Sequence, residues 1–458
     1  MAARQSPTQG PLTKDQLIAV MADGAKPKDQ WRVGAEHEKF GFDRSTLRRP
    51  AYEGPSGIHA MLTGLQRFGW SPVEEGGHLI ALERKNAEGF AASVSLEPGG
   101  QFELSGAPLL TMHDICNETG QHLMEVKQVA DQLNLGFLGA GFDPLWTRED
   151  VPVMPKGRYD IMRSYMPKKG KLGLDMMLRT CTIQANLDYA SEADMVAKFR
   201  TSLALQPIAT ALFACSPFIE GKPSGFLSAR ANVWTDTDPD RTGMIGFVFE
   251  DGFGYERYAD YALDTPMYFA KRDGKYVDAS GQSFRDFLKG ELPALPGELP
   301  TIKDWNDHLT TLFPEVRLKS YLEMRGADGG PWSRICALPA LWTGIFYDAP
   351  SLAAAWDLCK DWDIQDHERL RRDVTRLGLK AEVAGRSVRD IAVDMVAIAR
   401  EGLKNRARFS GGMVDERGYL SELEDIADSG LTPADRLLAL YHGEWQGDVS
   451  RLYRDFAY

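Results

Sequence analysis

Two glutamates in one short stretch have a spacing that suits the binding of a positively charged ligand. Residues 95–106 predict a β-hairpin, in which Glu97 precedes a Pro-Gly-Gly turn and Glu103 follows it. Side chains alternate between the two faces of a strand, and the positions between these polar residues are apolar. The hairpin is therefore expected to present both carboxylates on one face and a hydrophobic surface on the other.

Three further stretches show the same alternation and are predicted to be strands of the same sheet. They are residues 33–40, 182–189 and 321–325. The polar residues that share one face of these strands are Glu36, Glu38, Thr182, Gln184, Asn186, Asp188, Glu323 and Arg325. Together with the hairpin, they predict one sheet with a polar face rich in carboxylates and amides.

This polar face has two interpretations. An antiparallel sheet commonly leaves one face in water, which would explain the alternation without any chemistry. A solvated face usually mixes lysine, arginine, threonine and glutamate, whereas these strands collect glutamate, glutamine and asparagine with a single arginine. Two carboxylates about 7 Å apart repel by roughly 2 kcal/mol at an effective dielectric near 20. Because Mg²⁺ binds carboxylates together with nucleotide phosphates, the face predicts a magnesium-nucleotide site.

The composition is that of an acidic globular protein. The 458 residues are 43% hydrophobic, the formal net charge is −12, and the pI is about 5.3. This charge repels polyphosphates and so disfavours bulk binding to nucleic acid or to anionic membranes. The five cysteines form no Cys-x-x-Cys pair, and the N-terminus has no apolar signal core. These features predict a soluble, cytoplasmic protein in a reducing compartment.

One basic segment is unusual in this acidic chain. Residues 156–179 contain seven lysine or arginine side chains against two aspartates, a net charge of +5. Their glycines and prolines predict a loop, and a second irregular segment follows at residues 225–243. Arginine pairs well with carboxylates and phosphates, although a merely solvated loop is the alternative. The candidate anion-binding residues of the two segments are Lys156, Arg158, Arg230 and Arg241.

Capping residues indicate where helices begin. The predicted N-caps are Thr13, Thr111, Ser191, Ser387 and Thr432, and the last of them is expected to open the final helix. From residue 351 onward the sequence has helical periodicity and no polar constellation, so this part is expected to be scaffold. The chain has no P-loop motif and no Gly-x-Ser-x-Gly motif.

Several long motifs in a fixed order resemble those of one enzyme family, the glutamate-cysteine ligases of the plant and proteobacterial type. The resemblance runs from about residue 31 to the C-terminal tyrosine. It is carried by residues 35–42 (Ala-Glu-His-Glu-Lys-Phe-Gly-Phe), 95–108, 154–162 (Met-Pro-Lys-Gly-Arg-Tyr-Asp-Ile-Met), 173–180, 234–238 (Trp-Thr-Asp-Thr-Asp) and 321–332. Since a plastid transit segment is not evident, the chain is expected to be a bacterial member.

The resemblance implies a fold and a reaction. The fold would be α+β, with a curved antiparallel sheet forming a funnel flanked by helices, as in glutamine synthetase and the guanido kinases. The whole chain would be one catalytic domain, with the sheet and active site at about 30–345 and a helical part at about 350–458. ATP would phosphorylate the γ-carboxylate of L-glutamate, and the amine of L-cysteine would then displace phosphate to give γ-glutamylcysteine, the first intermediate of glutathione synthesis.

The resemblance also assigns roles to residues. Mg²⁺, with Mn²⁺ as an alternative, would be bound by Glu36, Glu38, Glu97, Glu103, Gln184 and Glu323. Arg158 and Arg230 would hold glutamate or phosphate groups, and Arg325 would face the transferring phosphoryl group. The protein is expected to be a monomer or a weak homodimer. Two alternatives remain open: a related ligase with another amine acceptor, and a non-catalytic nucleotide or amino-acid sensor.

Overall fold

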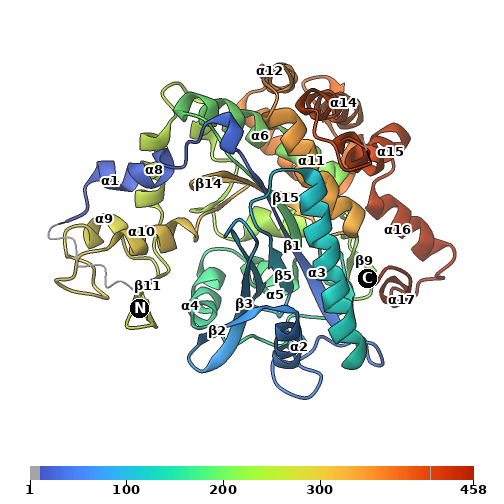
Figure 1. The fold of residues 1–458 in the computed structure, drawn as a ribbon, viewed down its shortest axis with the longest axis horizontal. Coiled ribbons are helices and arrows are strands. Elements are labelled where there is room, and N and C mark those ends of the chain that lie inside the picture. The colour runs from blue at the N-terminus through green and yellow to red at the C-terminus, as the bar shows by residue number, and fades with distance from the viewer. Residues whose placement is uncertain (1–10, 413) are drawn as a thin grey trace.

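A nine-stranded antiparallel sheet forms the centre of the computed structural model, which describes residues 11–412 and 414–458 (Figure 1). Its strands are β1 (Val33–Asp43), β2 (Ser71–Glu75), β3 (His78–Lys85), β4 (Ala91–Leu96), β5 (Phe102–Ser105), β6 (Leu135–Leu138), β7 (Thr182–Leu187), β14 (Val316–Leu318) and β15 (Leu322–Asp328). The order is β14-β15-β7-β1-β5-β4-β3-β2, and β6 also pairs with β1. An antiparallel sheet with flanking helices confirms the predicted α+β class.

The register of the sheet places the predicted polar residues on one face. Residues directly opposite each other in an antiparallel pair point to the same side. The cross-strand partners include Glu36 with Gln184, Glu38 with Glu103, Ser95 with Glu103, and Asn186 with Glu323. The predicted hairpin and the three further predicted strands therefore contribute to a single polar face, and the β4–β5 hairpin closes as predicted through Gly100, whose φ is +75°.

Three long helices cover the apolar face of the sheet: α3 (Met112–Gln132), α6 (Glu192–Leu212) and α11 (Trp332–Phe346). Alternate residues of β7, such as Ile183 and Leu187, point into the same buried core as Leu203 of α6 and Trp342 of α11. Several of the later helices pack against α11 or α6, and Figure 1 shows the later helices in orange and red together on one side. They are α12 (Ala349–Asp357), α13 (Ile364–Leu377), α14 (Val388–Arg406), α15 (Ser421–Ser429), α16 (Pro433–His442) and α17 (Arg451–Asp455).

The remaining elements are short and surround the polar face and the sheet edges. The helices are α1 (Lys14–Ala22), α2 (Ile58–Leu65), α4 (Gly157–Tyr165), α5 (Gly173–Arg179), α7 (Ala229–Val233), α8 (Tyr255–Asp264), α9 (Phe284–Phe287) and α10 (Ile302–Leu309). The paired short strands are β8 (Phe218–Ile219) with β9 (Lys222–Pro223), β10 (Thr242–Gly243) with β13 (Phe313–Pro314), β11 (Phe269–Arg272) with β12 (Lys275–Asp278), and β16 (Glu382–Val383) with β17 (Arg386–Ser387).

The predicted N-caps are confirmed, but two other predictions from the sequence are wrong. Thr13, Thr111, Ser191, Ser387 and Thr432 each accept a backbone hydrogen bond at the start of a helix. The helix after Thr432 is not the final one, because α17 follows it. The basic segment at 156–179 is not a loop either, because it forms α4, a short 3₁₀ turn and α5.

No helix in the described part of the chain is long and apolar enough to cross a membrane. The prediction that the N-terminus has no apolar signal core concerns residues 1–10 in part, and these residues lie outside the described ones.

Two histidines lie buried beneath the polar face, on the side of the sheet covered by α3. His37 of β1 and His122 of α3 meet edge to face with ring centroids 5.6 Å apart, and neither ring nitrogen of either residue has a partner among the described residues. Burial lowers the pKa of both imidazoles well below the ordinary value, and nearby Lys39 lowers it further. Both histidines are therefore neutral in the folded protein.

The histidine pair should make the fold sensitive to acid. A histidine whose folded pKa is depressed stabilises the fold above its unfolded pKa of 6.5, and this contribution is lost as the pH falls. Between pH 6.5 and pH 5.5, each histidine should cost about 1 kcal/mol in the free energy of unfolding. Urea titrations at both pH values should therefore show a decrease about 1 kcal/mol smaller for His122→Gln than for wild type. Equal pH dependence in the two proteins would contradict this account.

Candidate active site

A narrow pocket of about 70 Å³ opens on the polar face of the sheet. It lies where the end of the β4–β5 hairpin, β7 and β15 meet the helices α4, α5 and α7. The ionisable side chains that line it are Glu38, Glu97, Arg158, Tyr159, Arg230 and Arg325. Met162, Met176, Met177 and Phe313 add an apolar wall. The pocket thus combines carboxylates from the sheet with arginines from the segments that cover it.

The carboxylates in and beside the pocket repel one another. Burial raises the pKa of Glu38 well above its usual value, and the charges of Glu97 and Glu103 raise it further. Burial likewise raises the pKa of Glu103, with Glu97 as the next cause. Each also accepts a hydrogen bond, Glu38 from the Thr182 amide at 2.9 Å and Glu103 from the Ser95 hydroxyl at 2.6 Å. These bonds fix the carboxylates in place while their charges remain poorly balanced.

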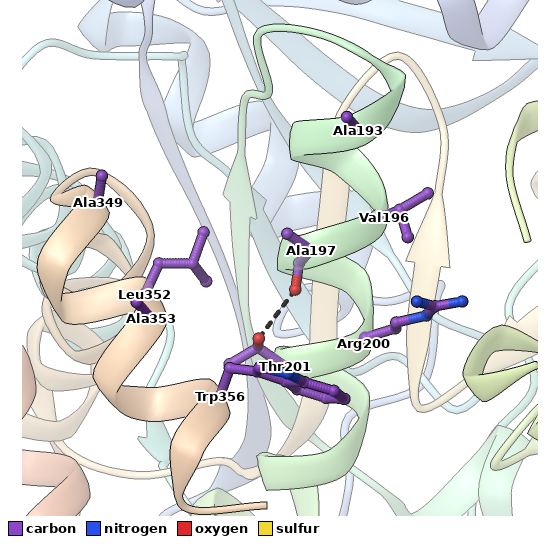
Figure 2. A pocket seen from close by; sticks show the side chains of 9 residues that line it. All are labelled: Ala193, Val196, Ala197, Arg200, Thr201, Ala349, Leu352, Ala353 and Trp356. Atoms are coloured by element: carbon purple, nitrogen blue, oxygen red, sulfur yellow. Dashed lines mark hydrogen bonds between the residues drawn. The ribbon is translucent and has the colours of Figure 1, made fainter. Parts of the chain in front are cut away.

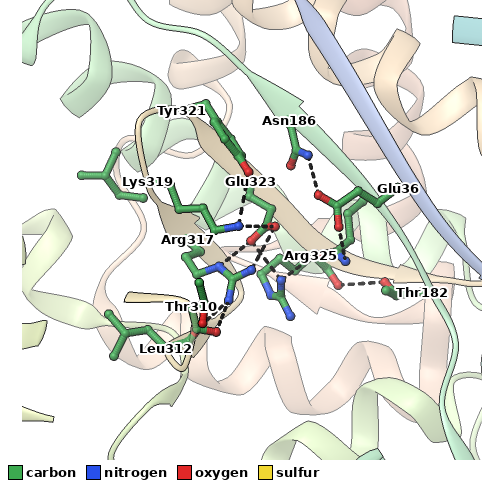
Figure 3. Close-up of polar contacts among 12 residues, drawn as sticks. Glu36, Thr182, Asn186, Thr310, Leu312, Arg317, Lys319, Tyr321, Glu323 and Arg325 are labelled. Atoms are coloured by element: carbon green, nitrogen blue, oxygen red, sulfur yellow. Dashed lines mark hydrogen bonds and ion pairs between the residues drawn. The ribbon is translucent and has the colours of Figure 1, made fainter. Parts of the chain in front are cut away.

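Glu36 extends this group along the sheet. The Asn186 amide donates to Glu36 Oε1 at 2.7 Å, and the Gln184 amide donates to Oε2 at 3.3 Å (Figure 3). Burial raises the pKa of Glu36 to about 7, and Glu323 and Glu103 contribute repulsion from its two sides. Asn186 Oδ1 is buried without a partner in the described chain, so an oxygen acceptor beside Glu36 remains free.

Glu323 has a different environment from the other predicted metal ligands. Arg317 donates to both of its oxygens, at 2.6 and 3.0 Å, and Arg325 donates to Oε2 at 2.9 Å (Figure 3). Burial raises the pKa of Glu323, but Arg317, Lys319 and Arg325 outweigh it and hold the pKa well below its usual range. Its charge is therefore already balanced by protein cations.

The structure thus brings the six predicted metal ligands onto one face but not into one group. Glu38, Glu97 and Glu103 influence one another directly, Glu36 and Gln184 adjoin them, and Glu323 belongs to a basic cluster. Within residues 11–412 and 414–458, no set of three or more histidine, cysteine, aspartate or glutamate side chains converges closely enough to form a ready metal centre.

The arginines of the pocket hold unused hydrogen-bond donors. The Nε atoms of Arg158 and Arg230 and the Nε1 atom of Trp234 are buried without partners in the described part of the chain. Arg230 is only 3% exposed, and its Nη2 donates to the Arg325 carbonyl at 2.7 Å. Buried donors nearly always have partners, so three unpaired ones around one pocket indicate a missing anionic ligand.

Arg325 is held at the centre of the site. Its Nη1 donates to Gln184 Oε1 at 2.6 Å and to Glu323, while its remaining nitrogens have no protein partner among the described residues. A register shift in the β15–β7 pairing falls between Met324 and Ala327, which is the position of Arg325. Such irregularities turn a side chain out of the regular pleat. Arg325 therefore presents free donors to the pocket that it lines.

Lys156 lies near the carboxylates rather than on the wall of the pocket. Its Nζ donates weakly to the Leu96 carbonyl at 3.4 Å and to the Tyr159 hydroxyl at 3.3 Å. Burial and Arg158 lower the pKa of Lys156, whereas Glu97 and Glu103 raise it. Lys156 is thus a counter-charge next to the hairpin carboxylates.

Arg241 does not reach the pocket, so its prediction as a substrate-binding residue is corrected. The side chain is fully buried and pairs with Asp238 at 2.6 Å. Its other nitrogens donate to the carbonyls of Thr311 and Pro266, and its guanidinium lies over the Tyr268 ring. All three of its guanidinium nitrogens make hydrogen bonds within the protein, so Arg241 fixes the segment around β10 and does not line the pocket.

Arg241→Met should therefore destabilise the fold without a direct effect on catalysis. Removing one partner of a buried pair leaves Asp238 uncompensated, which costs about 3–5 kcal/mol. Urea unfolding measures this loss, and kcat per folded molecule should stay within about twofold of wild type. As a control, Arg163→Met removes a half-exposed arginine of α4 and should change stability by less than about 0.5 kcal/mol. A stable Arg241→Met protein with a greatly raised KM would contradict the structural role.

The sequence prediction missed several residues of the site. Arg317 of β14 and Lys319, which directly follows β14, alternate with Leu318 and neutralise Glu323. Trp234 contributes an unpaired donor. The period-two alternation of Arg317 and Lys319 was a usable signal, although β14 has only three residues. Trp234 begins one of the motifs that carry the family resemblance, but its place beside the pocket depends on how α7 packs.

A larger cavity elsewhere is chemically unsuited to this role. It has about 420 Å³, lies between α6 and α12, and is lined mainly by alanine, valine, leucine and tryptophan (Figure 2). Its only charged residue is Arg200, whose guanidinium donates to the carbonyls of Val248 and Glu250. Its lining offers no carboxylate, so the smaller pocket on the polar face is the candidate active site.

Comparisons with known proteins give one consistent family. The model of glutamate-cysteine ligase family 2 matches residues 32–455. Chloroplastic glutamate-cysteine ligases match 98% of this chain: that of Medicago truncatula is 55% identical over 86% of its own length, that of Arabidopsis thaliana is 56% identical over 83%, and form B of Oryza sativa subsp. japonica is 55% identical over 88%. These matches span the whole sheet and the candidate site.

A solved structure supports the fold. The glutamate-cysteine ligase of Francisella tularensis in complex with AMP has a TM-score of 0.55 with this chain, at 12% identity over 93% of this chain and 89% of that one. At such low identity the likeness concerns the fold alone.

The expectation of a bacterial, cytoplasmic protein without a transit segment is wrong. The relatives at 54–56% identity are chloroplastic enzymes of plants, which contradicts it. The expectation rested on charge, cysteine pattern and the start of the chain, none of which reports the compartment directly.

The predicted resemblance and the comparisons agree. A family model that matches nearly the whole chain and relatives with more than half of their residues identical leave one assignment: this chain belongs to glutamate-cysteine ligase family 2.

Proposed function

We propose that the pocket bounded by Glu38, Arg158, Arg230 and Arg325 is the site where this enzyme joins L-glutamate to L-cysteine. The activity itself is that of the family, an ATP-dependent ligation that begins glutathione synthesis. One observation supports the location above all others. The pocket combines repelling carboxylates with unpaired buried donors, so it is suited to a ligand that carries both cations and anionic groups.

The proposed reaction has two steps. In the first, a γ-carboxylate oxygen of glutamate attacks the γ-phosphorus of ATP, and the bond to ADP breaks. In the second, the amine of cysteine attacks the carbonyl carbon of the acyl phosphate and loses a proton, and phosphate leaves with its oxygen. The products are γ-glutamylcysteine, ADP and phosphate. Phosphorylation is needed because a free carboxylate is a poor acyl donor.

The chain's own residues would orient the reactants and balance their charge. Arg158 and Arg230 offer free donors that suit the carboxylates of glutamate or the phosphates of ATP. Arg325, fixed by Gln184 and Glu323, would donate to the oxygens of the transferring phosphoryl group. Preorganised donors of this kind stabilise charge that develops in the transition state. The methionines and Phe313 would exclude water, which protects the acyl phosphate from hydrolysis.

The carboxylates are suited to hold Mg²⁺, which the family resemblance implies. Glu38, Glu97 and Glu103 offer oxygen ligands. Burial first, and then repulsion among these carboxylates, raises the pKa of Glu38 and Glu103, and a divalent cation would relieve that repulsion. Glu36, beside the unpaired Asn186 oxygen, is a further candidate. When bound, the ion would neutralise charge on the carboxylates and on the phosphates of ATP. Glu323 is better suited to positioning Arg325 than to binding metal, because Arg317 already occupies both of its oxygens.

We also propose that the chain acts as a single catalytic domain. Residues of the sheet and of the C-terminal helices, such as Leu187 and Leu403, belong to the same hydrophobic core. Separation of the part after residue 350 would expose that core, so the two parts are expected to fold together.

An assay of ADP release tests the proposed function. With ATP and Mg²⁺ present, ADP should form rapidly only when L-glutamate and L-cysteine are both supplied. L-alanine and L-serine as alternative amines would test the acceptor. Arg158→Met should raise the KM for glutamate at least tenfold, while Arg163→Met, from the same helix but outside the pocket lining, should not. ADP release that is indifferent to cysteine, or faster with another amine, would overturn the assignment.

A further inference from the structure

Glu315 and Arg371 form an ion pair next to the candidate active site, and the proposed reaction uses neither of them. Glu315 lies between β13 and β14, and Arg371 belongs to α13, one of the C-terminal helices. Arg371 Nε donates to Glu315 Oε1 at 2.8 Å, and its Nη2 donates to the Trp234 carbonyl at 2.8 Å. The two side chains are only 12% and 16% exposed. The pair is therefore shielded from solvent and held in a fixed geometry.

The Glu315 side chain lies beside the arginines of the candidate active site. The β14–β15 register pairs Val316 with Met324. The next pair therefore places Glu315 opposite Arg325, and the Arg325 amide donates to the Glu315 carbonyl at 3.2 Å. Residues directly opposite each other in an antiparallel pair lie close together. Both side chains also line a space of about 10 Å³ together with Arg230, and this space shares Arg230 and Arg325 with the lining of the pocket.

Glu315 and Arg325 do not pair with each other, although opposite charges that face each other across two strands usually attract. The neighbouring cross-strand residues, Arg317 and Glu323, do form an ion pair (Figure 3). Arg325 donates to Glu323 instead, and the Glu315 carboxylate accepts its hydrogen bond from Arg371. Arg371 thus takes up the carboxylate that the register of the sheet places opposite Arg325.

Glu315 also lies beside Arg230, the arginine whose Nε has no partner among the described residues. Burial lowers the pKa of Arg230, and the charge of Glu315 is one of those that oppose this effect. A second space of about 10 Å³ is lined by Arg230, Glu315 and Arg371 together. A Glu315 carboxylate without its partner in α13 would therefore compete with an anionic ligand for the donors of Arg230.

Helix α13 is well placed to hold Arg371 in this role, because it contacts both ends of α7. The Thr375 carbonyl accepts a hydrogen bond from the amide of Ser228, the N-cap of α7, at 3.0 Å. At the other end, Arg371 donates to the carbonyl of Trp234, which directly follows α7. Since α7 carries Arg230, these contacts fix Arg371 relative to the site.

We propose that Arg371 is a positioning residue that sequesters Glu315 and thereby keeps Arg230 and Arg325 available for the anionic groups of the substrates. The inference rests on the proposed function of the pocket. It gives the C-terminal helices, which the sequence predicted to be scaffold, a part in substrate binding.

A double-mutant cycle of Arg371→Met and Glu315→Gln tests this proposal. Arg371→Met should bind inorganic tripolyphosphate at least about tenfold more weakly by calorimetry in Mg²⁺ buffer, because a competing carboxylate lowers the fraction of sites that are free. The KM for L-glutamate should rise by a similar factor. Saturating substrates displace the carboxylate, so kcat should fall by less than about threefold. Glu315→Gln alone should change the affinity by less than about twofold, and the double variant should return to within about twofold of wild type.

Two further variants complete the experiment. Arg372→Met removes the next arginine of α13, which is exposed and lines none of these spaces, so it should match wild type. Arg371→Gln serves if Arg371→Met does not fold, because its amide can still donate to the Trp234 carbonyl while its charge is lost.

Three results would overturn the proposal. The first is an Arg371→Met protein that binds tripolyphosphate as wild type does. The second is a defect that Glu315→Gln fails to relieve. The third is additivity, in which Glu315→Gln raises the affinity equally in both backgrounds, since overall charge alone would then explain the effect. The tripolyphosphate cycle requires no turnover, so it is separate from the test of the proposed function, which fails if wild type shows no cysteine-dependent ADP release.

Discussion

Replacement of Arg325 by methionine should reduce kcat by about three orders of magnitude while the protein stays folded. The guanidinium is held by Gln184 and Glu323 and keeps free donors toward the pocket. Arginines that stabilise a transferring phosphoryl group contribute about 10³–10⁵ to kcat. Methionine keeps much of the side-chain length and loses the charge. The rate of ADP release at saturating glutamate, cysteine and ATP measures the effect.

A matched control comes from another arginine that is fixed by hydrogen bonds. Arg200 lines the apolar cavity of Figure 2 and donates to two backbone carbonyls. Arg200→Met should therefore lower stability but leave kcat per folded molecule within about twofold. If Arg325→Met retained more than about a tenth of wild-type kcat, its share of the barrier would be under ~1.4 kcal/mol and it would not be a principal catalytic residue.

Glu103→Gln should cost at least about three orders of magnitude in activity, because one of the proposed oxygen ligands of Mg²⁺ becomes neutral. The same change should stabilise the metal-free protein near pH 7. The folded pKa of Glu103 is raised above the ordinary 4.5, so its carboxylate destabilises the fold increasingly as the pH rises past that value. Glutamine cannot ionise, and its side-chain oxygen can still accept the Ser95 hydroxyl. Activity and thermal unfolding without metal measure the two effects.

Mg²⁺ should raise the melting temperature of wild type much more than that of Glu103→Gln, because binding to the folded state alone stabilises it. Glu118→Gln is the control. Burial raises the pKa of Glu118 to about 7, but it binds the Ala107 amide away from the pocket lining. The activity of Glu118→Gln and the rise of its melting temperature with Mg²⁺ should match those of wild type. An equal response to Mg²⁺ in all three proteins would show that Glu103 is not a ligand.

The polar face could be predicted from the sequence because strand geometry is local. Alternation at period two fixes which side chains share a face, and the pairings of Glu38 with Glu103 and Glu36 with Gln184 follow that rule. Alternation does not reveal which charges meet across strands. The carboxylate of Glu323 was expected among the metal ligands, yet Arg317 in the neighbouring strand pairs with it.

The helices over the pocket were missed because their local signals are weak. Neither α4, which begins after Lys156, nor α5, which begins after Leu172, has a side-chain cap. Their glycines and prolines therefore favoured a loop. Arg241 was misassigned for a related reason. Arginine pairs well with anionic ligands, but the partner of Arg241 is Asp238, three residues away, and the pair is buried. Burial depends on tertiary packing, which no local pattern records.

The transfer of oxygen from glutamate to phosphate tests the central claim most directly. With glutamate labelled by ¹⁸O in its γ-carboxylate, each turnover should place one labelled oxygen in the released phosphate, as an acyl phosphate in this pocket requires. Leu352→Trp, which fills the larger apolar cavity, should transfer the label at the wild-type rate, and Arg325→Met should do so about a thousandfold more slowly. Unlabelled phosphate from wild type, or transfer lost in Leu352→Trp and retained in Arg325→Met, would contradict the account.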